Sequence, residues 1–237
     1  KIIKSKIENT NNDKICGFVG DLVNMETGFI FKEFFERTIN SKKYESRTSH
    51  SFIDNSHREN YIFNSSINGI EESDLIFLIG TNPRYEATML NARIRKAYLN
   101  NKTDIISLNN VGDLTYPYTY LDGKTRNIVD IIDNRNEISK KILNSKKPII
   151  ILGESFFNLK SAKNLFYSIK EFLSKNFNFD ENWNCLNILL SNASSVGNFD
   201  LDIINHDKDL IKELNDNKFE IIYLLGQDDL KFKKQNE

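Results

Sequence analysis

The stretch that decides the fold runs from Asp74 to Ala97 and reads DLIFLIGTNPRYEATMLNARIRKA. Its first part, Leu75 to Ile79, is an unbroken apolar run, which is typical of a parallel strand buried on both faces. The glycine and the Asn-Pro pair in residues 80–83 then predict a tight turn. Beyond this turn the apolar residues change to helical spacing and share one face, as Ala87, Leu90, Ile94, Ala97 and Tyr98. The stretch therefore predicts a strand, a turn and a helix, in that order.

The turn is a candidate ligand site. A strand that enters a helix through a glycine-containing turn binds phosphate or a nucleotide in many α/β folds, because the first N–H groups of the helix are free. The candidate pocket consists of Gly80, Thr81, Asn82, Pro83 and Arg84. Arg84 could pair with a phosphate, whereas Glu86 would repel one. The same turn is also the ordinary connection of α/β proteins, so both interpretations stay open.

Similar units are expected on both sides of this stretch. Further buried strands, most of them ending in glycine, are predicted at Ile15–Gly20, Asp104–Leu108, Pro148–Gly153 and Phe219–Gly226. Helices are predicted at Met25–Ile39, Asn127–Ile132, Glu137–Leu143, Leu159–Phe172 and Trp183–Leu190. Gly20 to Asn24 forms a second strand-to-helix corner with a weaker phosphate signal. This alternation predicts an α/β fold with an open, mostly parallel, Rossmann-like sheet and helices on both faces.

Domain organisation follows from the same pattern. No low-complexity linker divides the chain, so one domain is expected over residues 15–226. Residues 1–14 are expected to form a lead-in segment, and residues 227–237 a charged tail.

The composition excludes several classes of function. The chain has 237 residues, 39% of them hydrophobic and 27% charged, which is typical of a globular protein. A net charge of −1 gives no field that would attract nucleic acid or an anionic membrane. The apolar runs are far shorter than the roughly 20 residues that a membrane-spanning helix needs. Nucleic acid and a direct membrane span are therefore not expected.

Motifs for catalysis are also missing. The sequence contains no Walker motif, GxGxxG, HExxH or CxxC. Ser155 follows a glycine but lacks the second glycine of a nucleophile elbow. No catalytic residue is assigned.

Metal ligands are sparse as well. His50, Asp54 and His57 could in principle hold a metal, but solvated loop histidines are the plainer interpretation. Cys16 and Cys185 cannot form an iron–sulfur cluster by themselves. A disulfide between them stays open, although a reducing compartment is the plainer interpretation. No metal site is assigned.

Several blocks resemble one known family. GTNPRYEATMLNARIRKAYL at residues 80–99 is similar to the largest iron–sulfur subunit of the peripheral arm of respiratory complex I. The C-terminal part of that subunit looks like a molybdopterin oxidoreductase. Tyr61–Ile67, Gly69–Asp74, Val111–Tyr116 and Trp183–Leu189 look like other blocks of this family, in the same order. Together they span most of residues 15–226.

The resemblance implies a function. It implies a truncated molybdopterin oxidoreductase fold without the family's N-terminal iron–sulfur region. The chain would be a non-catalytic structural part of mitochondrial complex I on the matrix side of the inner membrane, supporting the domain that carries electrons from NADH to ubiquinone. Its partners would be other peripheral-arm subunits, including a chain that carries the iron–sulfur clusters. No cofactor is expected in this chain, and the pocket at Gly80–Arg84 would be a remnant.

Two alternatives remain at this stage. The chain could be a fragment of an oxidoreductase that binds a nucleotide or molybdopterin at Gly80–Arg84. It could also be a free-standing module that senses a dinucleotide, as other parallel α/β domains do.

Overall fold

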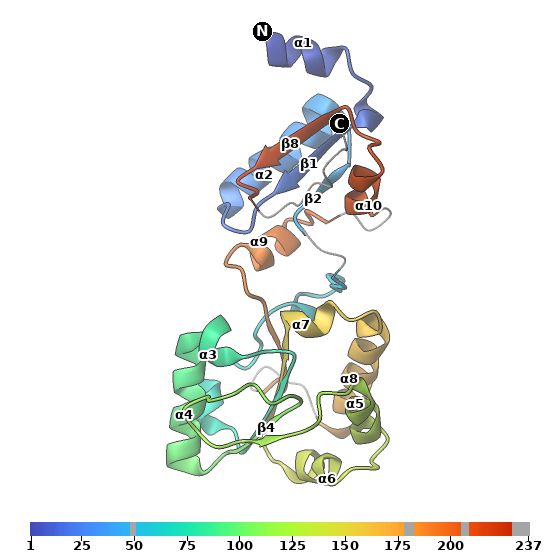
Figure 1. Cartoon of the computed structure of the whole chain (residues 1–237). Helices are drawn as coiled ribbons and strands as arrows, with labels where there is room; N and C mark the ends of the chain where they lie inside the picture. Colours follow the sequence, from blue (N-terminus) through green and yellow to red (C-terminus); the bar gives the residue numbers. More distant parts are fainter. Residues whose placement is uncertain (48–50, 178–182, 205–208, 229–237) are drawn as a thin grey trace. The chain divides into compact units, whose positions relative to one another are not determined.

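The structure is a computed structural model of the chain, and it describes residues 1–47, 51–177, 183–204 and 209–228. The chain forms two compact units (Figure 1). One unit is Phe52–Ser191, and the other combines Lys1–Ser51 with Asn192–Glu237. Each unit has its own parallel sheet flanked by helices, which confirms the α/β class. The single domain expected over residues 15–226 stays a prediction.

The unit Phe52–Ser191 contains a five-stranded sheet in the order β5-β4-β3-β6-β7. All four of its strand pairs are parallel. Along the chain, β4 and then β5 lie on one side of β3, and β6 and then β7 lie on its other side. The strand order therefore reverses between β3 and β6, which is where open α/β sheets usually form their ligand crevice. The strands are β3 (Leu75–Ile79), β4 (Asp104–Ser107), β5 (Thr119–Tyr120), β6 (Pro148–Gly153) and β7 (Leu186–Leu189).

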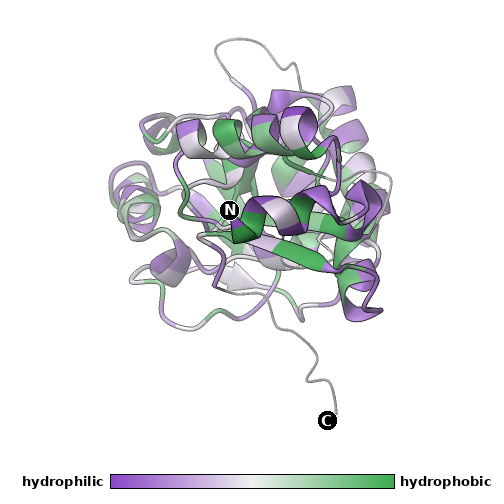
Figure 2. Cartoon of the chain, turned by 90° about the horizontal axis from the view of Figure 1, so that it is seen from above, coloured by the Kyte–Doolittle hydropathy of each residue, from purple (hydrophilic) through white to green (hydrophobic). Residues whose placement is uncertain are grey.

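Helices cover both faces of this sheet, as the sequence predicts. Helix α4 (Thr88–Asn101) lies on one face, while α5 (Thr125–Ile132) and α8 (Ala162–Asn176) lie on the other (Figure 1). Helix α6 (Glu137–Asn144) and the short α3 (Pro83–Glu86) and α7 (Glu154–Phe157) complete the unit, with 3₁₀ turns η3 (Arg58–Asn60) and η4 (Gly69–Glu72). Figure 2, which views the whole chain from above, shows both hydrophobic and hydrophilic residues along the helices.

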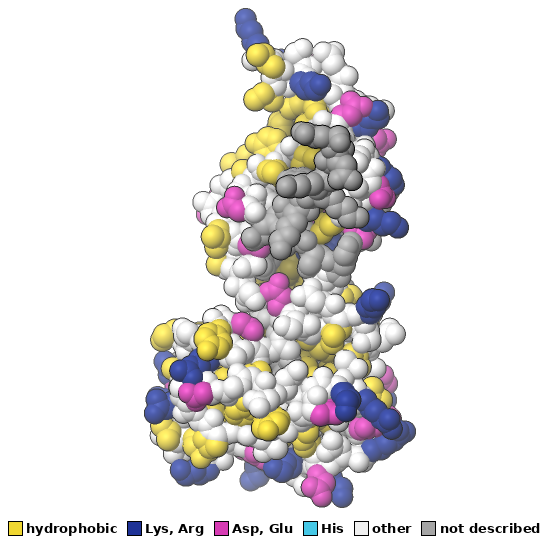
Figure 3. Space-filling model, viewed as in Figure 1, with side chains coloured by type: hydrophobic (Ala, Val, Ile, Leu, Met, Phe, Trp, Pro, Cys, Tyr) yellow, Lys and Arg dark blue, Asp and Glu magenta, His cyan; other side chains and the backbone are white. Residues whose placement is uncertain are grey.

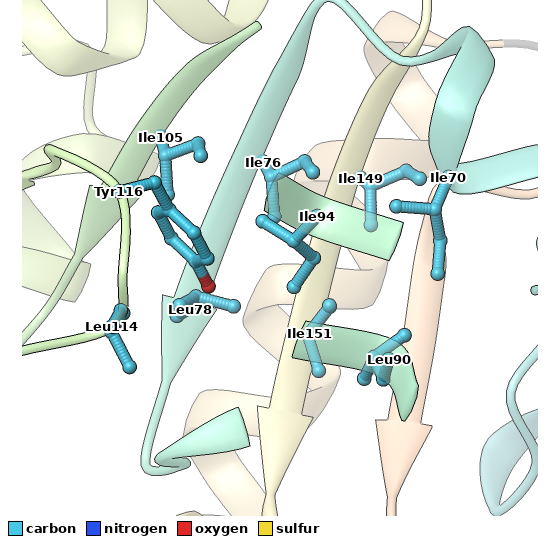
Figure 4. Packing of buried hydrophobic residues seen from close by; sticks show 10 residues of the cluster. All are labelled: Ile70, Ile76, Leu78, Leu90, Ile94, Ile105, Leu114, Tyr116, Ile149 and Ile151. Carbon is cyan, nitrogen blue, oxygen red and sulfur yellow. The ribbon is translucent and has the colours of Figure 1, made fainter. Parts of the chain in front are cut away.

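The core on the α4 face shows why the central stretch folds as it does. Alternate residues of β3, Ile76 and Leu78, point to Leu90 and Ile94 of α4, and all four are buried (Figure 4). Ile105 of β4 and Ile149 and Ile151 of β6 extend the same cluster. On the opposite face, residues of β3 and β6 with α5, α6 and α8 line a small apolar cavity of about 20 Å³. Both faces of β3 are therefore apolar, as its unbroken hydrophobic run requires.

One predicted helix is wrong. Residues within Trp183–Leu190 form strand β7, which pairs in parallel with β6. Asn187 is a polar residue in the middle of this strand, and its side chain is fully buried. Its amide accepts a hydrogen bond from the Ser65 backbone N–H at 2.8 Å and donates one to the Ser65 hydroxyl at 2.8 Å. The partner that makes this strand possible lies far away in the sequence.

The other unit contains a three-stranded parallel sheet in the order β2-β1-β8. Its strands are β1 (Ile15–Val19), β2 (Tyr44–Glu45) and β8 (Ile221–Leu225). Its helices are α1 (Ile2–Glu8), α2 (Met25–Glu33), α9 (Ser195–Asp200) and α10 (Leu210–Asn215), with a 3₁₀ turn η1 (Asn12–Lys14). The predicted helix Met25–Ile39 is present, but its second half is the π-helix η2 (Phe34–Ile39). The predicted last strand is also present, but it is half-exposed at the sheet edge rather than buried.

The sequence predicts a lead-in segment and a charged tail at the two ends of the chain. The expected lead-in contains α1, which has no buried residue. Most of the expected charged tail, residues 229–237, lies outside the described residues. In the part of the chain that the structure describes, no helix is long and apolar enough to cross a membrane.

The packing of Ile94 predicts that its truncation strongly lowers the stability of the protein. Ile94→Ala should lower the free energy of unfolding by about 2–5 kcal/mol, because it removes a fully buried side chain from between the helix and the sheet. Met89→Ala on the same helix is the control, since Met89 is 71% exposed and should change stability by less than about 0.5 kcal/mol. Urea unfolding measures both variants, and equal losses would contradict the packing described here.

Candidate functional site

Two glycines close the end of the sheet at the point where the strand order reverses. Gly80 follows β3 and Gly153 ends the adjacent strand β6. A Cβ atom on Gly153 would lie 2.4 Å from the carbonyl oxygen of Gly80 and 2.4 Å from Cβ of Thr81. Gly80 itself has φ +68°, and a Cβ there would lie 2.6 Å from the backbone nitrogen of Phe156 in α7. Backbone and α7 therefore fill the space beside the turn, and glycine is needed at both positions.

The polar groups of the turn are satisfied by a side chain of its own short helix. Glu86 accepts a hydrogen bond from the Asn82 backbone N–H at 2.9 Å and another from the Thr81 hydroxyl at 2.6 Å. Asn82 caps α3 by accepting a hydrogen bond from the Arg84 N–H, and its amide donates to the carbonyl of Val111. The Glu86 carboxylate thus takes donors that a bound phosphate would need.

Arg84, the one cation of the candidate pocket, is also paired. Its guanidinium donates to the carboxylate and to the backbone carbonyl of Asp113, each at 2.6 Å. The Thr115 backbone N–H and then Arg84 hold the pKa of the Asp113 carboxyl below its usual value. Asp113 is therefore ionised at neutral pH and offsets the charge of Arg84. The pair fastens the loop after β4 to the turn after β3.

The second predicted corner, residues 20–24, is closed in a similar way. A Cβ on Gly20 would lie 1.6 Å from the carbonyl oxygen of Gly226, which follows the neighbouring strand β8. Asn24 caps α2 by accepting a hydrogen bond from the Thr27 N–H at 2.9 Å. This corner, too, brings two strand ends into backbone contact.

Of the three residues considered as metal ligands, the structure describes Asp54 and His57. His50 lies outside the described residues, and His57 is exposed. Asp54 accepts hydrogen bonds from the Ser56 N–H, the Asn60 amide and the Tyr167 hydroxyl, each at 3.0 Å. Burial acts to raise the pKa of Asp54, but the hydrogen bonds from Ser56 and Tyr167 outweigh it and leave the pKa lowered. Asp54 therefore fastens its loop to α8, and residues 1–47, 51–177, 183–204 and 209–228 contain no cluster of three metal-ligating side chains.

The remaining candidates are Ser155, Cys16 and Cys185. Ser155 is exposed on the short helix α7. Cys16 and Cys185 are free thiols, each fully buried, and burial raises both pKa values to about 12. Both cysteines are therefore thiols near neutral pH, which makes them poor nucleophiles.

In the structure the turn Gly80–Arg84 is closed by its own hydrogen bonds and by α7. Sequence reasoning treated Glu86 as a group that repels phosphate and missed that it bonds to the turn itself. An acidic residue in the first turn after an Asn-Pro cap is a local signal that could have revealed this. No local signal points from Arg84 to Asp113, since 29 positions separate them.

Comparison with known proteins identifies relatives along the whole chain. The Molybdopterin oxidoreductase family profile matches residues 1–237. The chain is 35% identical to the NADH-ubiquinone oxidoreductase 75 kDa subunit of Reclinomonas americana, covering 100% of the chain and 36% of that protein. It is 34% identical to the mitochondrial NADH-ubiquinone oxidoreductase 78 kDa subunit of Candida albicans, and the match covers 95% of the chain and 30% of that protein. It is 29% identical to the mitochondrial NADH dehydrogenase [ubiquinone] iron-sulfur protein 1 of Solanum tuberosum, and the match covers 98% of the chain and 31% of that protein. The chain spans about a third of the length of these relatives.

The close contacts of Gly153 predict that a larger residue there lowers the stability of the protein. Gly153→Ala should lower the free energy of unfolding by about 1–3 kcal/mol, because the new methyl group meets backbone rather than a movable side chain. The control is Gly197→Ala in α9, where the nearest atom would be 3.7 Å from the added Cβ. That variant should lose no stability, since alanine favours a helix. Chemical denaturation distinguishes the two, and indistinguishable midpoints would contradict a closed turn.

The role of Glu86 predicts a difference between two substitutions. Glu86→Ala should cost about 1–3 kcal/mol of stability, because it leaves the Asn82 N–H without its acceptor. Glu86→Gln keeps an oxygen for that N–H and should retain most of the stability. If the alanine variant unfolds at the same denaturant concentration as the wild type, the carboxylate does not hold the turn.

Proposed function

We propose that this chain, which belongs to the molybdopterin oxidoreductase family, is a non-catalytic structural part of the peripheral arm of mitochondrial complex I. In this role it supports the iron–sulfur domain that carries electrons from NADH to ubiquinone. The named relatives are subunits of NADH-ubiquinone oxidoreductase, and two of the names include "mitochondrial". Its partners are other peripheral-arm subunits, and it works on the matrix side of the inner membrane.

The observation that carries the non-catalytic part of the proposal is the closed turn at Gly80–Arg84. This turn lies where the strand order reverses, so it is where a nucleotide would be expected. Phe156 takes the space beside Gly80, and Glu86 takes the Asn82 N–H and the Thr81 hydroxyl. A phosphate bound to the Asn82 N–H and the Thr81 hydroxyl would have to displace the Glu86 carboxylate. The residues present do not fit a pterin nucleotide, which supports a retained fold with a structural use.

The cysteine content supports placing the iron–sulfur clusters on a partner chain. Clusters of the common types are held by four cysteines. This sequence has two, and both are buried as free thiols in different units. We therefore propose that the chain itself carries no cofactor.

Native mass tests the proposed assembly. Gently solubilised membranes from the source organism should show this chain in a particle of the size of complex I, together with cysteine-rich and flavin-bearing subunits identified from their peptides. Migration as a free protein would contradict the proposal.

Elemental analysis tests the absence of a cofactor. The purified chain should be colourless and should contain neither iron nor molybdenum in stoichiometric amount. A second chain from the same particle, selected for its cysteine content, is the control and should contain iron. Stoichiometric metal in the purified chain would favour the oxidoreductase alternative.

A further inference from the structure

Strand β8 forms an open edge of the sheet in the unit Lys1–Ser51 with Asn192–Glu237. It is hydrogen-bonded to β1 along all five residues, from Ile15↔Ile221 to Val19↔Leu225. No strand among the described residues pairs with its other side. All five residues of β8 are apolar or aromatic, and its central three are exposed by 37%, 38% and 42% for Ile222, Tyr223 and Leu224.

The other sheet edges that the structure describes are protected. Strands β2 and β5 are only two residues long. The edge of β7 is covered by the segment before η4, because Ile188 donates its N–H to the carbonyl of Ile62 at 3.0 Å and Asn64 donates to the carbonyl of Leu186 at 2.7 Å. Strand β8 carries no lysine, proline or bulge, which are the usual devices that keep an edge strand from pairing.

Both faces of β8 can continue an apolar layer. On one face, the Tyr223 ring lies 5.9 Å from that of Phe31 and 5.8 Å from that of Phe34, measured between ring centroids. On the other face, Ile222 and Leu224 stand beside Cys16 and Phe18, which pack against α10. Figure 3 shows hydrophobic side chains on the visible face of the unit that contains β8. A strand placed next to β8 would therefore meet apolar side chains above and below it.

A half-exposed apolar strand is unusual in a parallel sheet, since such sheets are normally buried on both faces. We propose that β8 is the site at which a further strand adds to this sheet. The occupant is an extended, apolar segment of the polypeptide that corresponds to the part of the relatives outside the match, about two thirds of their length. Every named strand pair in the described sheets is parallel, so the added strand is expected to run parallel to β8. This inference rests on the proposed function, because it places the occupant in the same assembly.

Hydrogen exchange of the wild-type protein tests the inference. Amides in a peptide covering residues 219–226 are compared between the purified chain and the complex from solubilised membranes. Exchange in the complex should be slower by about tenfold or more, because an added strand hydrogen-bonds the outer amides. A peptide covering β3 is the control and should be protected in both samples. Equal exchange of the 219–226 peptide in the two samples would overturn the inference.

The result separates this inference from the proposed function. If the chain is absent from the complex, the proposed function itself fails. If the chain is present and residues 219–226 exchange as fast as in the purified chain, the assembly is correct and β8 is not its strand-addition site.

A pair of variants gives a second readout. Leu224→Lys places a charge on the strand edge, while Met89→Lys places one on an exposed position of α4 in the other unit. A lysine at either position can extend into solvent in the free chain, so both variants should fold, which circular dichroism checks. Incorporation of Leu224→Lys into the complex should fall at least about tenfold below that of Met89→Lys, because the occupant would bury the charge. Equal incorporation of the two folded variants would contradict the inference.

Discussion

The structure depends on the contact between two adjacent strand ends. At the ends of β3 and β6 the backbone of Gly80 and the Cβ of Thr81 come so close to Gly153 that no side chain fits there. The same kind of contact joins Gly20 and Gly226 in the other unit. In open parallel sheets a ligand usually binds in the crevice outside the strand ends where the strand order reverses. Here the turn after β3 packs against Gly153 and the start of α7, so this place is part of the packed structure.

The donors and the positive charge of the turn after β3 are paired within the chain. An exposed turn at a helix start would leave N–H groups and a cation free for an anion. In this chain Glu86 bonds to the turn, and Asp113 neutralises Arg84. The two carboxylates supply the negative charge that a ligand would otherwise bring. The charges and N–H groups of the turn are therefore paired without a ligand, which fits the structural role proposed for this chain.

The local part of the fold could be predicted from the sequence. The apolar run of β3 and the helical spacing of α4 act over neighbouring residues, so their packing followed from the pattern alone. Strand β7 could not be predicted, because its buried Asn187 needs Ser65 as a partner. The exposure of β8 was missed for a related reason, since burial of a strand depends on its place in the sheet. The pocket at Gly80–Arg84 stays a prediction, and the close contact beside Gly80 involves Phe156, which lies far away in the sequence.

The most direct test of a closed turn is the thermal stability of the purified chain with added nucleotide. Guanine nucleotide and NAD, each at millimolar concentration, are compared with buffer of matched ionic strength. The account predicts an unchanged melting temperature with both. A ligand present at 100 times its dissociation constant would add about 2.7 kcal/mol of stability. A rise in melting temperature that Glu86→Gln or Arg84→Ala alters would show that the turn opens to bind a nucleotide, and it would contradict the structural role proposed for this site.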